Sequence, residues 1–170
     1  MPDLFNGDPV PVDAFELGLN LTDWITRHPA SAIDRIITQT IDYMRSDLRI
    51  ERIGGVGYCF GGKYVPRFLA KKKGIDVGFI AHPSNLLPEE IKNIVGPVSI
   101  SAGELDASFN STARFNAESI LSTNNRTYES ALYSRAPHGY AVRPDVSVPQ
   151  QKYAKEASYF QAVLWFMQWL

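Results

Sequence analysis

The stretch Gly57-Tyr58-Cys59-Phe60-Gly61-Gly62 surrounds the only cysteine of the chain. An apolar run, residues 53–58, precedes Cys59, and a segment typical of a helix follows it. Glycines two residues before and two residues after a nucleophile permit a sharp strand-to-helix turn, because side chains would collide there. The stretch therefore predicts a nucleophile elbow, with the sulfur at the positive end of a helix dipole that favours the thiolate. The alternative interpretation is a small buried thiol in an ordinary tight turn.

Length and composition predict one globular domain over residues 1–170. Hydrophobic residues make up 45% and charged residues 21% of the chain, as in ordinary globular proteins. The net charge of -1 gives no general attraction to nucleic acid or to an anionic membrane. A lone cysteine excludes an intramolecular disulfide, and residues 1–13 do not have the pattern of a secretory signal. We therefore expect a cytoplasmic protein whose partner is a small molecule.

Hydrophobic periodicity predicts strands alternating with helices. The expected strands are residues 52–58, 75–81, 97–102 and 127–133. The expected helices are residues 13–27, 31–48, 63–73, 108–122 and 150–170. A capping box is expected at Ser31 and Asp34, and Pro66 is expected in the first turn of its helix. This alternation favours an α/β fold with a mainly parallel sheet, helices on both faces, and ligands at the carboxyl ends of the strands.

Two polar segments follow the later strands. In Gly103-Glu104-Leu105-Asp106 the candidate acid is Asp106, with Glu104 as the competing acid and a simple turn as the alternative to both. His138 lies on a loop between a proline and a glycine, which predicts a positioned side chain. Nucleophile, acid and histidine follow one another in the order of an α/β-hydrolase triad. In that hypothesis His138 takes the thiol proton, Cys59 attacks an ester or lactone carbonyl, and the Phe60 backbone N–H donates to the oxyanion.

The other two histidines have less specific interpretations. His28 stands at an expected helix end, where capping or simple exposure is expected. His82 follows the strand 75–81, where it either lines the same cleft or has a hydrogen-bonded structural role. No group of histidines, carboxylates or thiols has the spacing of a zinc site, so no metal is predicted.

The sequence resembles the dienelactone hydrolase family over its whole length, and most closely the fungal branch. The resemblance depends on successive blocks in the family order: Pro2-Asp3-Leu4-Phe5, Gly57 to Gly62, Gly103-Glu104-Leu105-Asp106 and His138-Gly139-Tyr140-Ala141-Val142-Arg143. It implies a carboxylic-ester hydrolase that needs no cofactor, with Cys59, Asp106 and His138 as triad. It also implies that Arg143 receives a substrate carboxylate by a bidentate contact, with a surface arginine as the alternative. The further substrate-binding candidates are Tyr58, His82 and Tyr140.

The chain departs from the family pattern at its beginning. Residues 1–7 resemble a segment from the middle of the family domain, so an N-terminal block of strands is expected to be lacking. In the family that block supplies a second oxyanion donor and a glutamate that activates the thiol, so weakened activity is expected. Asn6 and Gly7 stand near the place of an additional substrate-binding arginine in bacterial relatives.

The same departure leaves one edge of the strand 52–58 open. We expect a partner chain, as in a homo-oligomer, or a rearranged N-terminal segment to cover it.

Two functional alternatives to the hydrolase follow. One is a non-hydrolytic binding or isomerising protein that uses His138 or Asp106 without acyl transfer. The other is an assembly protein whose open sheet edge is the working surface.

Overall fold

The computed structural model describes residues 2–11, 14 and 18–170. It divides the chain into two compact units, Met1–Glu51 and Arg52–Leu170. The single domain expected from the sequence stays a prediction.

The first unit contains two helices, α1 (Leu21–Arg27) and α2 (Ala30–Ser46). The Asn20 side chain caps α1, so this helix begins later than the predicted residue 13; residues 12–13 and 15–17 lie outside the described residues. Pro29 is the N-cap of α2 and makes no side-chain capping bond. The predicted capping box at Ser31 and Asp34 is therefore wrong, because the helix begins at Ala30 and Ser31 already lies within its first turn.

His28 is the C-cap of α1, and its side chain is only 11% exposed. The ring packs 4.5 Å from the Trp24 ring and 5.4 Å from the Phe5 ring, centroid to centroid. Its Nε2 lies 2.9 Å from the Asp8 carboxylate. His28 therefore packs in an aromatic cluster of the first unit, and the expectation of simple exposure is wrong.

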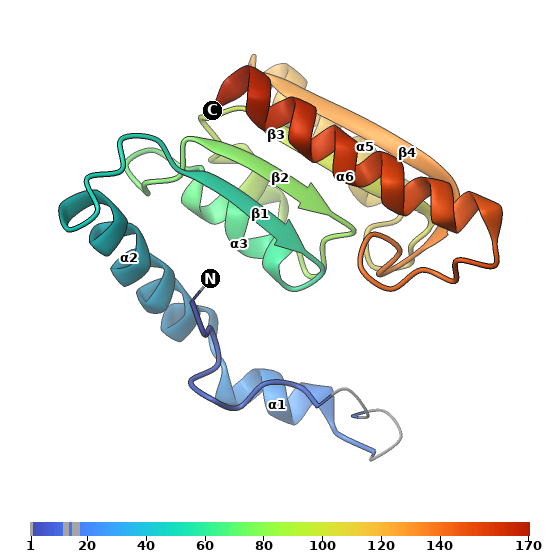
Figure 1. Ribbon diagram of the computed structural model, residues 1–170, viewed down its shortest axis with the longest axis horizontal. Helices are drawn as coiled ribbons and strands as arrows, with labels where there is room; N and C mark the ends of the chain where they lie inside the picture. Colours follow the sequence, from blue (N-terminus) through green and yellow to red (C-terminus); the bar gives the residue numbers. More distant parts are fainter. Residues whose placement is uncertain (1, 12–13, 15–17) are drawn as a thin grey trace. The chain divides into compact units, whose positions relative to one another are not determined.

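The second unit is a sheet of four parallel strands in the order β1-β2-β3-β4 (Figure 1). The strands are β1 (Gly54–Tyr58), β2 (Val77–Ala81), β3 (Val98–Leu105) and β4 (Tyr128–Pro137). The helices are α3 (Gly61–Phe68), α4 (Pro88–Lys92), α5 (Ser111–Thr123) and α6 (Pro149–Trp169). The structure thus confirms the predicted α/β class and the parallel sheet.

Helices cover both faces of this sheet (Figure 1). On one face Ile80 and Ile100 pack into a cluster with Val65 of α3 and Leu121 of α5. On the other face Phe79 packs with residues of α6. Neighbouring residues of β2 thus face opposite layers, and the whole strand is buried because both layers are apolar.

Several boundaries differ from the predictions. The helix α3 begins at Gly61 directly after the elbow, so Pro66 lies in its second turn and not in its first. The strand β3 continues to Leu105, which makes Glu104 a strand residue. The short helix α4 was not expected. Within the described residues β1 has a strand on one side only, as predicted for an open edge, and what covers that edge stays a prediction.

Candidate functional site

The turn at Cys59 has the geometry of the predicted elbow. β1 ends one residue before Cys59 and α3 begins two residues after it. Cys59 has a φ of 50°, in the left-handed region that non-glycine residues rarely adopt. Three backbone bonds hold it there: the Cys59 N–H donates to the Ala81 carbonyl at 3.2 Å, and the Cys59 carbonyl accepts from the N–H groups of Gly62 and Ser84, each at 3.0 Å. The sheet and the loop that follows β2 thus hold Cys59 in this strained backbone conformation.

The glycines of the elbow have unequal importance. A Cβ at Gly57 would lie 2.3 Å from the carbonyl oxygen of Gly61, and one at Gly62 would lie 2.7 Å from the Pro83 side chain. A Cβ at Gly61 would meet nothing within 4 Å. Close packing therefore requires Gly57 and Gly62, and the prediction that the glycine two residues after the cysteine is sterically required is wrong.

The structure brings Cys59, His138 and Asp106 into one chain of contacts. The Cys59 sulfur lies 3.1 Å from His138 Nε2, and His138 Nδ1 lies 3.0 Å from both carboxylate oxygens of Asp106. The buried Asp106 carboxylate also accepts from the backbone N–H groups of Ser108 at 2.8 Å and Phe109 at 3.1 Å. These donors fix the carboxylate, which in turn orients the imidazole.

The competing acid, Glu104, lies elsewhere in the hydrogen-bond network. Its exposed carboxylate accepts from the Ser134 hydroxyl at 2.9 Å and from the Arg135 backbone N–H at 2.8 Å. These partners belong to the end of β4, where the pairing of β3 with β4 is interrupted by a register shift. Glu104 thus accepts hydrogen bonds from the irregular end of β4. Asp106, the first residue after β3, is the acid that contacts His138.

The electrostatics favour a charged pair. The hydrogen bond from His138 is the main cause that lowers the pKa of Cys59 to about 7, against the opposing effect of burial. The hydrogen bond to Asp106, followed by that to Cys59, raises the pKa of His138 to about 9. Burial acts to raise the pKa of Asp106, but the bonds from His138 and the two amides outweigh it and the pKa is lowered. Between about pH 7 and 9 the favoured state is thus thiolate beside imidazolium.

The sequence matches the dienelactone hydrolase family over residues 1–170. The chain belongs to this family. Among curated proteins, it is 46% identical to "Hydrolase pyvD" of Aspergillus violaceofuscus and 38% identical to "Hydrolase tropI" of Talaromyces stipitatus, covering 100% of this chain and 69% of each relative. Family membership supports a hydrolase of small ester or lactone substrates.

A solved structure supports the fold assignment. The crystal structure of a putative dienelactone hydrolase from Klebsiella pneumoniae has a TM-score of 0.74 at 15% identity, over 96% of this chain and 70% of that one. The fold is therefore that of the dienelactone hydrolases, and the expected resemblance to that family is confirmed.

In this member of the family two residues predicted to touch substrate, His82 and Tyr140, are completely buried, which corrects the prediction. The Tyr140 hydroxyl lies 2.5 Å from the Ser101 hydroxyl, and burial raises the Tyr140 pKa. The His82 ring lies 5.2 Å from the His138 ring and 5.4 Å from the Tyr140 ring. Neither ring nitrogen of His82 has a hydrogen-bond partner among the described residues, so the hydrogen-bonded structural role stays a prediction. Burial is the main cause that lowers the His82 pKa to about 4, and this ring is therefore neutral at pH 7.

Three predicted residues remain, namely Tyr58, Phe60 and Arg143. Tyr58 is half-buried against the ring of Phe79. The Phe60 backbone N–H, at the N-cap of α3, is among the groups that lower the Cys59 pKa. Arg143 is exposed, on the loop that follows His138, and makes no ion pair with a described residue. The roles of these three residues stay predictions.

The sequence interpretation missed Ser84. Its hydroxyl lies 3.4 Å from the Cys59 sulfur and 3.3 Å from His138 Nε2. Ser84 stands three residues after the end of β2, at the same edge of the sheet as Cys59, Asp106 and His138. The rule that selected the other candidates, a polar residue just past a strand, would have selected it too.

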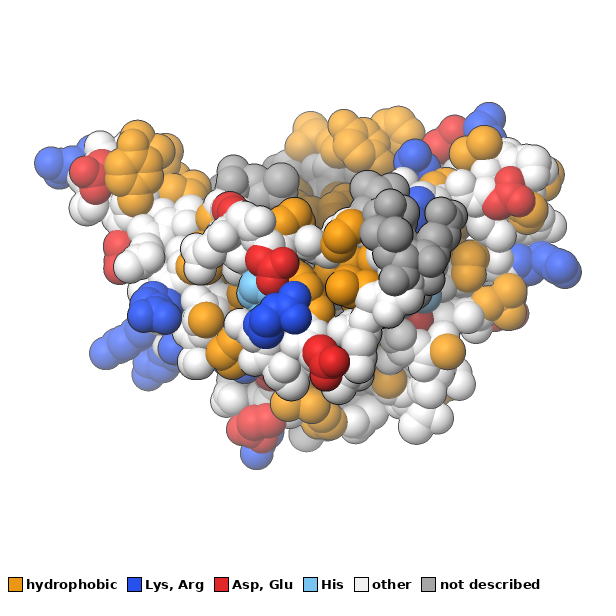
Figure 2. Space-filling view, turned by 90° about the horizontal axis from the view of Figure 1, so that it is seen from below, with side chains coloured by type: hydrophobic (Ala, Val, Ile, Leu, Met, Phe, Trp, Pro, Cys, Tyr) orange, Lys and Arg blue, Asp and Glu red, His pale blue; other side chains and the backbone are white. Residues whose placement is uncertain are grey.

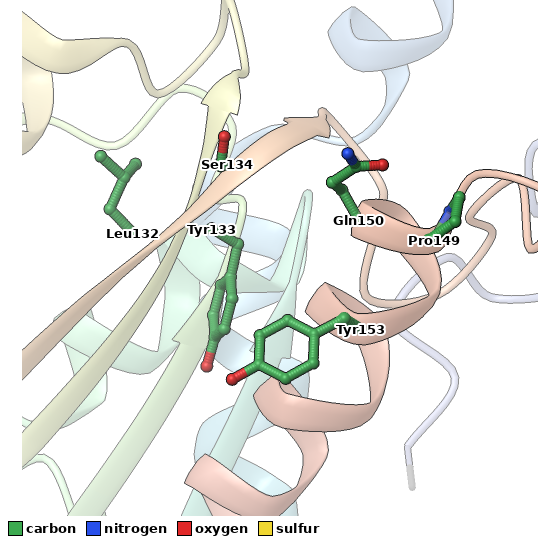
Figure 3. A pocket seen from close by; sticks show the side chains of 6 residues that line it. All are labelled: Leu132, Tyr133, Ser134, Pro149, Gln150 and Tyr153. Carbon is green, nitrogen blue, oxygen red and sulfur yellow. The ribbon is translucent and has the colours of Figure 1, made fainter.

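A pocket of about 340 Å³ lies between β4 and the start of α6 (Figure 3). Its lining consists of Leu132, Tyr133, Ser134, Pro149, Gln150 and Tyr153. The rings of Tyr133 and Tyr153 lie close together in it (Figure 3). No triad residue lines this pocket, so we do not assign the reaction to it.

The described residues form neither a metal-ligand cluster nor a helix that could span a membrane. Figure 2 shows basic and acidic side chains on the same face, with hydrophobic side chains exposed between them. Within the described part of the chain, no three histidine, cysteine or acidic residues are grouped as metal ligands. In that same part no helix combines the length and the apolar character that crossing a membrane requires.

Proposed function

We propose that this chain hydrolyses a small carboxylic ester or lactone with Cys59 as nucleophile and a thioester acyl-enzyme as intermediate. The contact of 3.1 Å between the Cys59 sulfur and His138 Nε2 carries this proposal, because the other ring nitrogen of His138 contacts the buried Asp106 at 3.0 Å. A nucleophile, a base and a group that orients the base are the three parts that acyl transfer requires.

In the acylation step the Cys59 thiolate attacks the carbonyl carbon and forms a C–S bond. The carbonyl oxygen becomes an oxyanion, to which the Phe60 backbone N–H donates at the start of α3, where the helix dipole is positive. His138 then gives its Nε2 proton to the leaving alkoxide as the C–O bond breaks. An ester releases an alcohol, whereas a lactone opens into a hydroxyacyl group that stays on the enzyme.

In the deacylation step the neutral His138 removes a proton from water, and the resulting hydroxide attacks the thioester carbonyl. The C–S bond breaks and the carboxylic acid leaves. Thiolate and imidazolium are restored, so protons and electrons balance over the cycle without a cofactor. Asp106 stays ionised in both steps and stabilises the imidazolium, in agreement with its lowered pKa.

A carboxylate on the substrate is the second part of the proposal. Arg143 is exposed, and its backbone N–H donates to the Gly139 carbonyl at 3.0 Å, which ties it to the loop of His138. A guanidinium carried on the loop of His138 is suited to bind a carboxylate by two parallel hydrogen bonds. We therefore expect acidic esters and lactones to be better substrates than neutral ones.

Intact-mass spectrometry after incubation with a panel of small esters and lactones tests this function. The expected result is an acyl adduct on the wild-type chain that is absent from Cys59→Ala, which also loses turnover of an activated ester. Ser111→Ala, an exposed serine at the start of α5, serves as the matched control and should keep both. Ester turnover that persists unchanged in Cys59→Ala refutes the nucleophile. Ligand binding that survives this substitution without any adduct favours the non-hydrolytic alternative.

A further inference from the structure

The hydroxyl of Ser84 completes a triangle with the two groups that exchange the proton. The sulfur of Cys59 lies 3.4 Å and Nε2 of His138 lies 3.3 Å from this oxygen, while sulfur and Nε2 are 3.1 Å apart. Both contacts are within the reach of hydrogen bonds of these types. We propose that Ser84 is a further catalytic residue, which holds the thiolate–imidazolium pair by donating to the sulfur and accepting from Nε2–H. This inference rests on the proposed function of Cys59.

The Ser84 hydroxyl can donate one hydrogen bond and accept others at the same time. A serine hydroxyl has one proton to donate and two lone pairs to accept. When Cys59 is a thiolate and His138 is protonated, the hydroxyl satisfies both at once. When the proton is on the sulfur, the hydroxyl can instead donate to Nε2 and accept from S–H, but both bonds then join neutral groups and are weaker than bonds to charged groups. Ser84 therefore stabilises the charged pair more than the neutral pair.

The loop that carries Ser84 is fixed against the nucleophile. The Ser84 backbone N–H donates to the Cys59 carbonyl at 3.0 Å, and the preceding Pro83 packs against Gly62 so closely that a Cβ there would overlap it. Farther along the loop, the Lys63 ammonium donates to the Asn85 carbonyl at 2.9 Å. The hydroxyl is thus held in place by contacts at three successive residues, as a catalytic group requires.

The test is the pH dependence of Cys59 alkylation by iodoacetamide, since only the thiolate reacts. In Ser84→Ala the rate at pH 6.5 should fall about tenfold, because a hydrogen bond to a charged group is removed. At pH 10 the rates of variant and wild type should agree, because the thiol is then ionised in both. Ser84→Thr, which keeps a hydroxyl, should restore the wild-type profile, and the exposed Ser111→Ala should not change it.

A Ser84→Ala profile that superimposes on the wild type overturns the inference, and so does a loss of the same size at every pH. If Ser84→Ala does not fold, Ser84→Gly removes the same hydroxyl and is judged by the same profile. The alkylation does not depend on ester turnover. An acyl adduct on Cys59 with no effect of Ser84→Ala therefore refutes only this inference, whereas a displaced profile without any adduct refutes only the proposed hydrolysis.

Discussion

Replacing Asp106 by asparagine removes one charge and turns one of the two oxygens that contact His138 Nδ1 into an NH2 group. The Asp106 oxygen that accepts from the Ser108 and Phe109 amides also contacts His138 Nδ1, and an asparagine oxygen can keep these three contacts. The loop after β3 should therefore keep its shape. What is lost is the negative charge that stabilises the imidazolium, together with the second oxygen that contacts Nδ1.

The expected loss of rate can be worked out from the raised pKa of His138. A rise of the His138 pKa from 6.5 to about 9 corresponds to roughly 3 kcal/mol in favour of the charged form, at about 1.4 kcal/mol for each pKa unit. Asp106 is the larger of the two causes, so we assign it about 2 kcal/mol. We expect Asp106→Asn to lower the rate of ester hydrolysis at pH 7.5 by at least ~30-fold.

The assay is the pH profile of kcat/KM for an activated ester, with Glu104→Gln as the matched control. Glu104 bonds to the end of β4 and not to the histidine, so its variant should keep the wild-type profile. In Asp106→Asn the falling limb should move from about 9 toward the ordinary histidine value of 6.5. A wild-type rate with the falling limb still near 9, or an equal loss in Glu104→Gln, refutes the assignment of the acid.

Two further predictions concern the pH profile and the elbow. Cys59, whose pKa is lowered to about 7, is a thiolate above that pH, and His138, raised to about 9, loses its proton above that value, so kcat/KM should rise through pH 7 and fall through pH 9. A rate that increases steadily to pH 10 contradicts the charged pair. Gly57→Ala should destabilise the fold by about 3 kcal/mol in urea unfolding, because its Cβ would overlap a backbone oxygen. Gly61→Ala, where the space is open, should cause no loss, and equal stability of the two variants contradicts this packing argument.

The elbow could be predicted from the sequence because its causes are local. A strand, a strained residue and a helix start follow one another within a few positions, and glycine is needed where the chain approaches itself. The distinction between Gly61 and Gly62 was not accessible in this way. It depends on Pro83, which comes from the loop after another strand.

The choice between the two acids also depended on the tertiary structure. Glu104 and Asp106 have the same kind of side chain and stand two residues apart. The irregular end of the pairing between β3 and β4 gives Glu104 the Arg135 amide as its partner. Asp106 leaves the strand and points to the histidine. A pairing between residues 30 positions apart cannot be read from either segment alone.

The sequence by itself determined the α/β class, the sharp turn at Cys59 and the order in which Cys59, Asp106 and His138 follow the strands, because periodicity and turn chemistry act over short distances. Only the tertiary structure decided that Ser84 contacts both the Cys59 sulfur and His138 Nε2 and that His82 and Tyr140 are buried. Parallel strands bring their carboxyl ends to one edge of the sheet, but which side chains meet there depends on register and on the path of each loop.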